Sequence, residues 1–155
     1  MPHHGSPRFT LPAWLRRLVY LTGAACLATG GAWLLLHSFG QVDRGFGPEP
    51  SALEHPALVL HGVAAAALVW CFGAVWLGHV RRAWHRGFNR RGGGTMVALM
   101  AWLVVSGLGL YYLADEQWRA ATSLGHWTLG LLAAAWLPLH ILRGRRAVRR
   151  AARHA

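Results

Sequence analysis

Residues 55–80 read HPALVLHGVAAAALVWCFGAVWLGHV, a stretch of 26 residues without Asp, Glu, Lys or Arg. A helix of about 20 mainly apolar residues is long enough to cross the hydrocarbon core of a bilayer. Three more stretches of at least 23 residues lack these charges, and they cover residues 18–42, 92–114 and 120–142. The sequence therefore predicts an all-α integral membrane protein, a bundle of four transmembrane helices.

Composition supports the same class. The chain has 155 residues, of which 54% are hydrophobic and 14% charged, whereas about 25% of the residues of a soluble domain are charged. This balance argues against a soluble enzyme and against a disordered chain. We expect one membrane domain over residues 1–155. Its predicted helices cover about 13–38, 56–82, 94–114 and 121–143, followed by a basic C-terminal tail at 144–155.

The arginines predict the orientation of these helices. Fourteen of the 16 arginines precede the first stretch, lie between the second and third, or follow the fourth, and all five acidic residues lie on the opposite side. The positive-inside rule then places both termini in the cytoplasm. Because the arginines flank membrane spans, we expect them to meet anionic lipid headgroups and do not expect a nucleic-acid partner, despite the net charge of +11.

Histidines are numerous in the predicted spans. Six of the ten lie in a span or at its edge: His37, His55, His61, His79, His126 and His140. Ionisable residues in a membrane helix are functional hypotheses by default, because burying them is costly. At 3.6 residues per turn, His61 and His79 share one face of the second helix, and His126 and His140 share one face of the fourth.

The second and fourth helices run in the same direction, so the histidines are expected to pair by depth, His61 with His126 and His79 with His140. The two spacings, 18 and 14 residues, differ by about 6 Å of helix rise. A tilt of the second helix or a bend at Pro138 would absorb the difference. In a weaker alternative, only one level is a true pair.

Histidines that face each other inside a helix bundle suit a metal-centred cofactor, because two imidazoles can take both axial positions of a haem iron. We therefore predict two b-type haems, an outer one held by His61 and His126 and an inner one held by His79 and His140. No catalytic residue is predicted. His37 and His55 have no such pairing, and three roles stay open for them: interfacial positions, replacement of an outer ligand, or proton acceptors at a quinol site.

Small residues offer space beside these histidines. Such positions either admit a flat macrocycle or let two membrane helices pack closely. The candidates are Gly30, Gly31, Gly73, Gly107 and Gly130.

Three stretches carry a resemblance to bacterial cytochromes b of the four-helix type: GHVRRAW at 78–84, GLYY at 109–112, and SLGHWTLG at 123–130 followed by His140. That group includes the membrane subunits of formate dehydrogenase and Ni/Fe hydrogenase, and the short flavinylation-associated cytochromes are closer in size. The resemblance covers nearly the whole chain from the first helix. It implies that the fourth helix supplies His126 and His140 as haem ligands, and that the second supplies His61 to the outer haem. The formate-dehydrogenase type takes the inner partner from the first helix, which here has no histidine at its inner end, so His79 is the substitute.

The expected function is that of a di-haem b-type cytochrome of the bacterial inner (cytoplasmic) membrane, with no bond-making chemistry of its own. It would move electrons between the quinone pool and a periplasmic c-type cytochrome, a flavoprotein or a larger respiratory complex. The main alternative is a non-haem anchor or assembly subunit of a membrane complex. A transporter of haem or metal ions and a pigment-binding subunit are two further alternatives. The transporter would favour a hydrated path, although no carboxylate lies in a span. The pigment-binding subunit does not require paired histidines.

Overall fold

The computed structural model describes residues 11–43, 45, 47–87 and 89–151. The fold is all-α and 85% helical, with one short antiparallel pair of strands. In chain order the elements are α1 (Ala13–Phe39), β1 (Val42–Asp43), β2 (Pro48–Glu49), α2 (Glu54–Val75), the π-helical turn η1 (Trp76–Val80), α3 (Arg81–His85), α4 (Arg90–Tyr112) and α5 (Glu116–Ala151).

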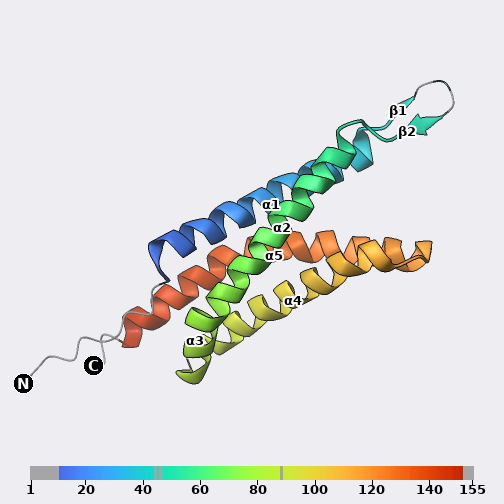
Figure 1. The fold of residues 1–155 in the computed structure, drawn as a ribbon. Coiled ribbons are helices and arrows are strands. Elements are labelled where there is room, and N and C mark those ends of the chain that lie inside the picture. Colours follow the sequence, from blue (N-terminus) through green and yellow to red (C-terminus); the bar gives the residue numbers. More distant parts are fainter. Residues whose placement is uncertain (1–10, 44, 46, 88, 152–155) are drawn as a thin grey trace, which may run out of the picture.

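The long helices form two helical hairpins (Figure 1). In the first, α1 packs along α2 and the two strands make the turn between them; in the second, α4 packs along α5. Contacts between the hairpins are sparse, and they include those between α1 and α5. Because the strands and the α4–α5 turn lie at one end of the molecule, α2 and α5 run in the same direction, as the sequence predicts.

Local residues end the helices at these turns. Gly40 is the residue at which α1 ends: its N–H still bonds the Leu36 carbonyl at 2.8 Å, and a Cβ at this position would lie 2.6 Å from that oxygen, so the turn requires glycine. At the other end of the hairpin, Gly87 and Asn89 turn the chain into α4 with φ angles of 74° and 46°. Left-handed angles of this kind favour glycine and asparagine.

Three helices of the described residues are long and apolar enough to span a membrane: Ala13–Phe39, Glu54–His85 and Arg90–Tyr112. The fourth predicted span lies in α5, which is not among the three. Its stretch without charged residues, 120–142, is interrupted by His126, Pro138 and His140, and these side chains lower its mean hydropathy. The chain therefore has at least three candidate spans, which fits a multi-pass membrane protein.

The second span is one continuous helix over Glu54–His85 with a π-helical turn inside it. The N–H of Arg81 bonds the carbonyl of Trp76, five residues back. A π turn holds an extra residue, so it shifts the phase of every residue beyond it. The prediction that His61 and His79 share a face assumed an unbroken α-helix, and η1, which contains His79, breaks that assumption.

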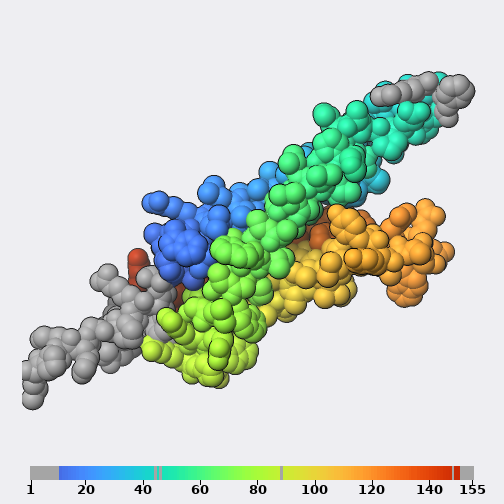
Figure 2. All heavy atoms as spheres, in the orientation of Figure 1, coloured from blue at the N-terminus to red at the C-terminus, as the bar shows by residue number. Residues whose placement is uncertain are grey.

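Little of the molecule is buried within itself. Among the described residues the buried non-glycine side chains are those of Leu15, Ala57, Cys71, Ser106 and Ala133. Large apolar side chains cover the outer surfaces of both hairpins, which separate toward the strand end in the space-filling view (Figure 2). Such surfaces suit lipid as the surrounding solvent, since within a bilayer the helices need only satisfy their own backbone groups.

Several predicted boundaries were wrong. The helices expected at 94–114 and 121–143 are Arg90–Tyr112 and Glu116–Ala151. The glycines at 92–94 lie inside α4, not in the preceding loop. The basic segment expected as a tail continues α5 as far as Ala151, because arginine is a strong helix former; residues 152–155 lie outside the described residues.

Candidate functional site

His61 on α2 and His126 on α5 meet between the two hairpins. Their ring centroids lie 6.2 Å apart and the ring planes are nearly perpendicular, at 88°. Both side chains are partly buried. The structure therefore brings together the two residues predicted for the outer level.

The His61 ring is held by the neighbouring helix of its own hairpin. Its Nδ1 lies 3.0 Å from the backbone carbonyl oxygen of Cys26 on α1 and 3.3 Å from the Thr29 hydroxyl. A carbonyl oxygen can only accept, so Nδ1 carries the proton and donates. The lone pair of the neutral imidazole then resides on Nε2.

The His126 ring is held in the same way by α4. Its Nδ1 lies 2.9 Å from Oγ of Ser106, and that hydroxyl donates to the Trp102 carbonyl at 2.7 Å. With its proton engaged there, the Ser106 oxygen accepts from Nδ1–H of His126. The lone pair of His126 is therefore also on Nε2.

A glycine lies under each ring. A Cβ on Gly30 would lie 2.9 Å from Cε1 and 3.0 Å from Nδ1 of His61, closer than real Cβ atoms approach. A Cβ on Gly107 would lie 3.4 Å from Cε1 of His126. Gly30 is thus required for the position of His61, whereas Gly107 allows an ordinary close contact.

The two hairpins consequently present equivalent arrangements. Each carries one histidine on its second helix, with Nδ1 bonded to the first helix and the ring packed on a glycine of that helix. Metal-binding histidines almost always donate their second ring N–H to a carbonyl, carboxylate or water, which fixes the tautomer and orients the ring. The hydrogen bonds to Cys26 and Ser106 do this for both rings.

The spacing of the rings also fits a shared metal. With metal–nitrogen bonds of about 2.1 Å, two imidazoles on opposite sides of one ion have ring centroids about 6 to 7 Å apart. An edge-to-face aromatic contact gives a similar distance, so the fixed tautomers, not the distance alone, favour ligation. In the described residues no group of three or more His, Cys, Asp or Glu could hold a metal. Two protein ligands suit a metal whose remaining positions are filled by a macrocycle.

Among the described residues, the inner histidines lie within range of a charge interaction but lack the ring contact that joins His61 and His126. His79 and His140 interact electrostatically, and the backbone of Gly92 lies near the His140 ring. The Trp136 indole N–H donates to the Gly92 carbonyl at 3.4 Å, whereas Nδ1 of His140 is buried with no hydrogen-bond partner among the described residues. The inner pair therefore lacks, among the described residues, the Nδ1 hydrogen bond that orients each ring of the outer pair.

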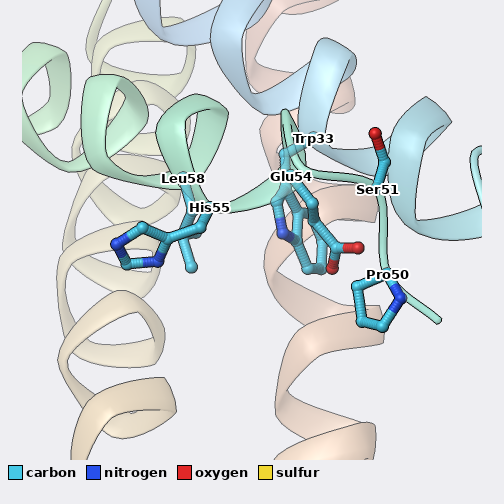
Figure 3. A pocket seen from close by; sticks show the side chains of 6 residues that line it. All are labelled: Trp33, Pro50, Ser51, Glu54, His55 and Leu58. Carbon is cyan, nitrogen blue, oxygen red and sulfur yellow. The ribbon is translucent and has the colours of Figure 1, made fainter.

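His37 and His55 lie at the strand end, away from both pairs. Nδ1 of His37 lies 2.7 Å from Oε1 of Glu54, and its ring stacks on Trp33 with centroids 4.8 Å apart. His55 lines a small pocket of about 200 Å³ beside Glu54 and Trp33, and its imidazole points away from the Glu54 carboxylate (Figure 3). The hydrogen bond to Glu54 engages His37 within its own hairpin, and neither residue makes a ring contact with another histidine of the described residues.

Sequence reasoning missed the residues that orient His61 and His126. Ser106 is a polar residue in an apolar span, beside Gly107, and this signal was present but not used. Cys26 acts through its carbonyl, for which no side-chain signal exists. Of the candidate glycines, Gly30 and Gly107 lie against histidines; Gly130 meets Leu103, while a Cβ on Gly31 or Gly73 would meet nothing within 4 Å.

No family model, curated protein or solved structure matches this chain.

Proposed function

We propose that the chain is a di-haem b-type membrane cytochrome that transfers electrons between the quinone pool and an extracytoplasmic redox partner. One observation carries the proposal: His61 and His126 face each other from two hairpins, and each has its Nδ1 proton committed to a neighbouring helix. Both therefore offer an Nε2 lone pair of the kind that binds haem iron.

A bound haem would supply one-electron chemistry at the iron, and the protein's own residues would hold and tune it. The Cys26 carbonyl and the Ser106 hydroxyl fix the rotation of the two imidazoles. Their hydrogen bonds also raise the basicity of the ligating nitrogens. The apolar side chains of both hairpins keep water from the site, which influences its redox potential.

His79 and His140 are the proposed ligands of the inner haem. The electrostatic interaction between the two imidazoles, together with their pairing by depth on α2–η1 and α5, supports a shared ligand at this level. His126 and His140 are 14 residues apart on α5, which corresponds to about 21 Å of regular helix. Two haems at these depths would carry electrons across most of a hydrocarbon core of about 30 Å.

The proposed setting is the bacterial inner membrane, with four spans and both termini in the cytoplasm. The fourth span is α5, whose stretch at 120–142 has no charged residue. If α5 crosses the membrane, the arginines at the start of α1, between α2 and the apolar part of α4, and at the end of α5 all lie on one side, as the positive-inside rule requires.

Haem content tests the function directly. The protein is purified in detergent from a haem-replete host, and oxidised and dithionite-reduced spectra are recorded with a pyridine haemochrome assay. We expect two b-type haems per chain. The variant His126→Ala loses one of them, whereas the matched variant His55→Ala retains both. Absence of haem from the folded protein would contradict the proposal and favour a non-haem anchor or assembly subunit.

A further inference from the structure

A groove of about 390 Å³ lies between the end of the second helix and the start of α4. One wall consists of Trp76, Val80 and Trp84, which follow one another at intervals of four residues across η1 and α3. Val97 on α4 lines the opposite wall. Gly94 keeps the groove open, because a Cβ there would lie 3.7 Å from Cζ3 of Trp84 and a longer side chain would extend into the space.

Cationic side chains stand beside these apolar walls. Arg81 lines the groove and is exposed. Arg90 does not line the groove but contacts Trp84 of its wall: its Nε donates to the Trp84 carbonyl at 3.0 Å, and its guanidinium lies 5.9 Å from the centroid of the Trp84 ring. A guanidinium has five N–H donors, so this one keeps donors for another partner.

No Asp or Glu side chain of the sequence lies near this cluster. All five acidic residues of the sequence lie within 43–54 and 115–116, at the opposite end of the hairpins (Figure 1). A partner that complements the groove therefore combines a negative charge with an apolar body. The groove also adjoins the end of a candidate span, the depth at which a lipid headgroup meets its acyl chains.

We propose that this groove is a binding site for one anionic phospholipid of the cytoplasmic leaflet. An acyl chain lies along the apolar walls formed by Trp76 and Val97, and the phosphate is held by Arg81 and Arg90. Arginine binds phosphate oxygens with two parallel N–H donors, which favours a specific site over diffuse attraction. The site rests on the membrane topology proposed above but not on haem content, so its failure and the failure of the cytochrome assignment are distinguishable.

Lipid titration followed by native mass spectrometry tests the site. The delipidated full-length protein in detergent is titrated with phosphatidylglycerol and, separately, with phosphatidylcholine of the same acyl chains. We expect one phosphatidylglycerol to bind in preference to phosphatidylcholine. The variant Arg81→Gln weakens phosphatidylglycerol binding about fivefold, from about 1 kcal/mol per arginine near an anionic lipid. The control Arg145→Gln, which removes an exposed arginine of α5 outside the groove, leaves the affinity unchanged.

Two further measurements make the result decisive. The variant Gly94→Leu, which fills the groove, reduces binding of both lipids, and circular dichroism and size-exclusion chromatography establish that each variant is folded. Equal losses in Arg81→Gln and Arg145→Gln would overturn the proposal, because they would indicate general charge attraction. Displacement of the lipid by millimolar inorganic phosphate would also overturn it, because the site would then recognise phosphate without the acyl chain.

Discussion

The substitution Gly30→Ala tests whether the position of His61 matters to the proposed outer haem. The new Cβ would lie 2.9 Å from Cε1 of His61, and an ordinary contact begins at 3.4 Å. The imidazole must therefore move by about 0.5 Å while its Nδ1 remains tied to the Cys26 carbonyl. Metal–ligand distances in a well-built site hold within about 0.2 Å, so the displacement exceeds what ligation tolerates.

We expect Gly30→Ala to lower the haem affinity of the outer site about 10- to 100-fold, as substitutions that disturb the orientation of a metal ligand do. The assay is haem titration of the apoprotein, read from the low-spin absorption bands. Gly31→Ala is the matched control, since its Cβ would meet nothing within 4 Å. Both substitutions favour the helix by about 1 kcal/mol, so a weakened α1 cannot explain a loss. Equal haem binding by the two variants would refute the reasoning.

Three further predictions address the ligand anchor, the strand-end histidine and the topology. Ser106→Ala leaves the Nδ1–H of the partly buried His126 without its acceptor, and we expect haem retention at the outer site to fall about 10- to 100-fold in a pyridine haemochrome assay. The control is Thr128→Ala, because the Thr128 hydroxyl bonds carbonyls of its own helix, and this variant should behave as wild type. His37→Ala removes the hydrogen bond to Glu54 from a side chain that is 57% exposed. An exposed pair of this kind contributes little to stability, so the reduced spectrum should not change; loss of a haem would mean that His37 is a ligand. The topology is tested by introducing Asp115→Cys or Arg145→Cys, which lie near the two ends of α5, into a chain without its two native cysteines. An impermeant maleimide applied to spheroplasts should label the cysteine at position 115 but not the one at position 145. Labelling of both would show that α5 does not cross the membrane.

The helices were predictable because charge and hydropathy alone determine which segments can enter lipid. The ends of the helices were less predictable. The apolar part of α5 precedes its arginines and the apolar part of α4 follows the glycines at 92–94; once these apolar segments have formed helix, the adjoining residues extend it. The π-helical turn at Trp76–Val80 could not be predicted. The π-helical turn depends on how one extra residue is accommodated when the helices pack. A pattern analysed at 3.6 residues per turn assumes a regular α-helix and cannot reveal such a turn.

The outer histidines could be matched from the sequence because two parallel helices of similar depth leave few other pairings. The hydrogen bonds that orient them could not, because Cys26 contributes a carbonyl and every residue has one. Ser106 was a readable signal, since a hydroxyl in an apolar span usually bonds its own helix or a neighbouring polar group. It does both here, bonding the Trp102 carbonyl and the His126 ring.

Each hairpin orients one of the two histidines, and this arrangement suggests how the site between His61 and His126 can assemble in a membrane. In lipid there is no hydrophobic force to press helices together, and the hairpins share few contacts of their own. Each hairpin, however, orients its histidine through hydrogen bonds to its own first helix, so the orientation of each ring does not depend on the other hairpin. Under the proposed function, the bonds from His61 and His126 to one iron would then join the two halves. Cofactor binding would supply much of the attraction that the sparse contacts between α1 and α5 do not.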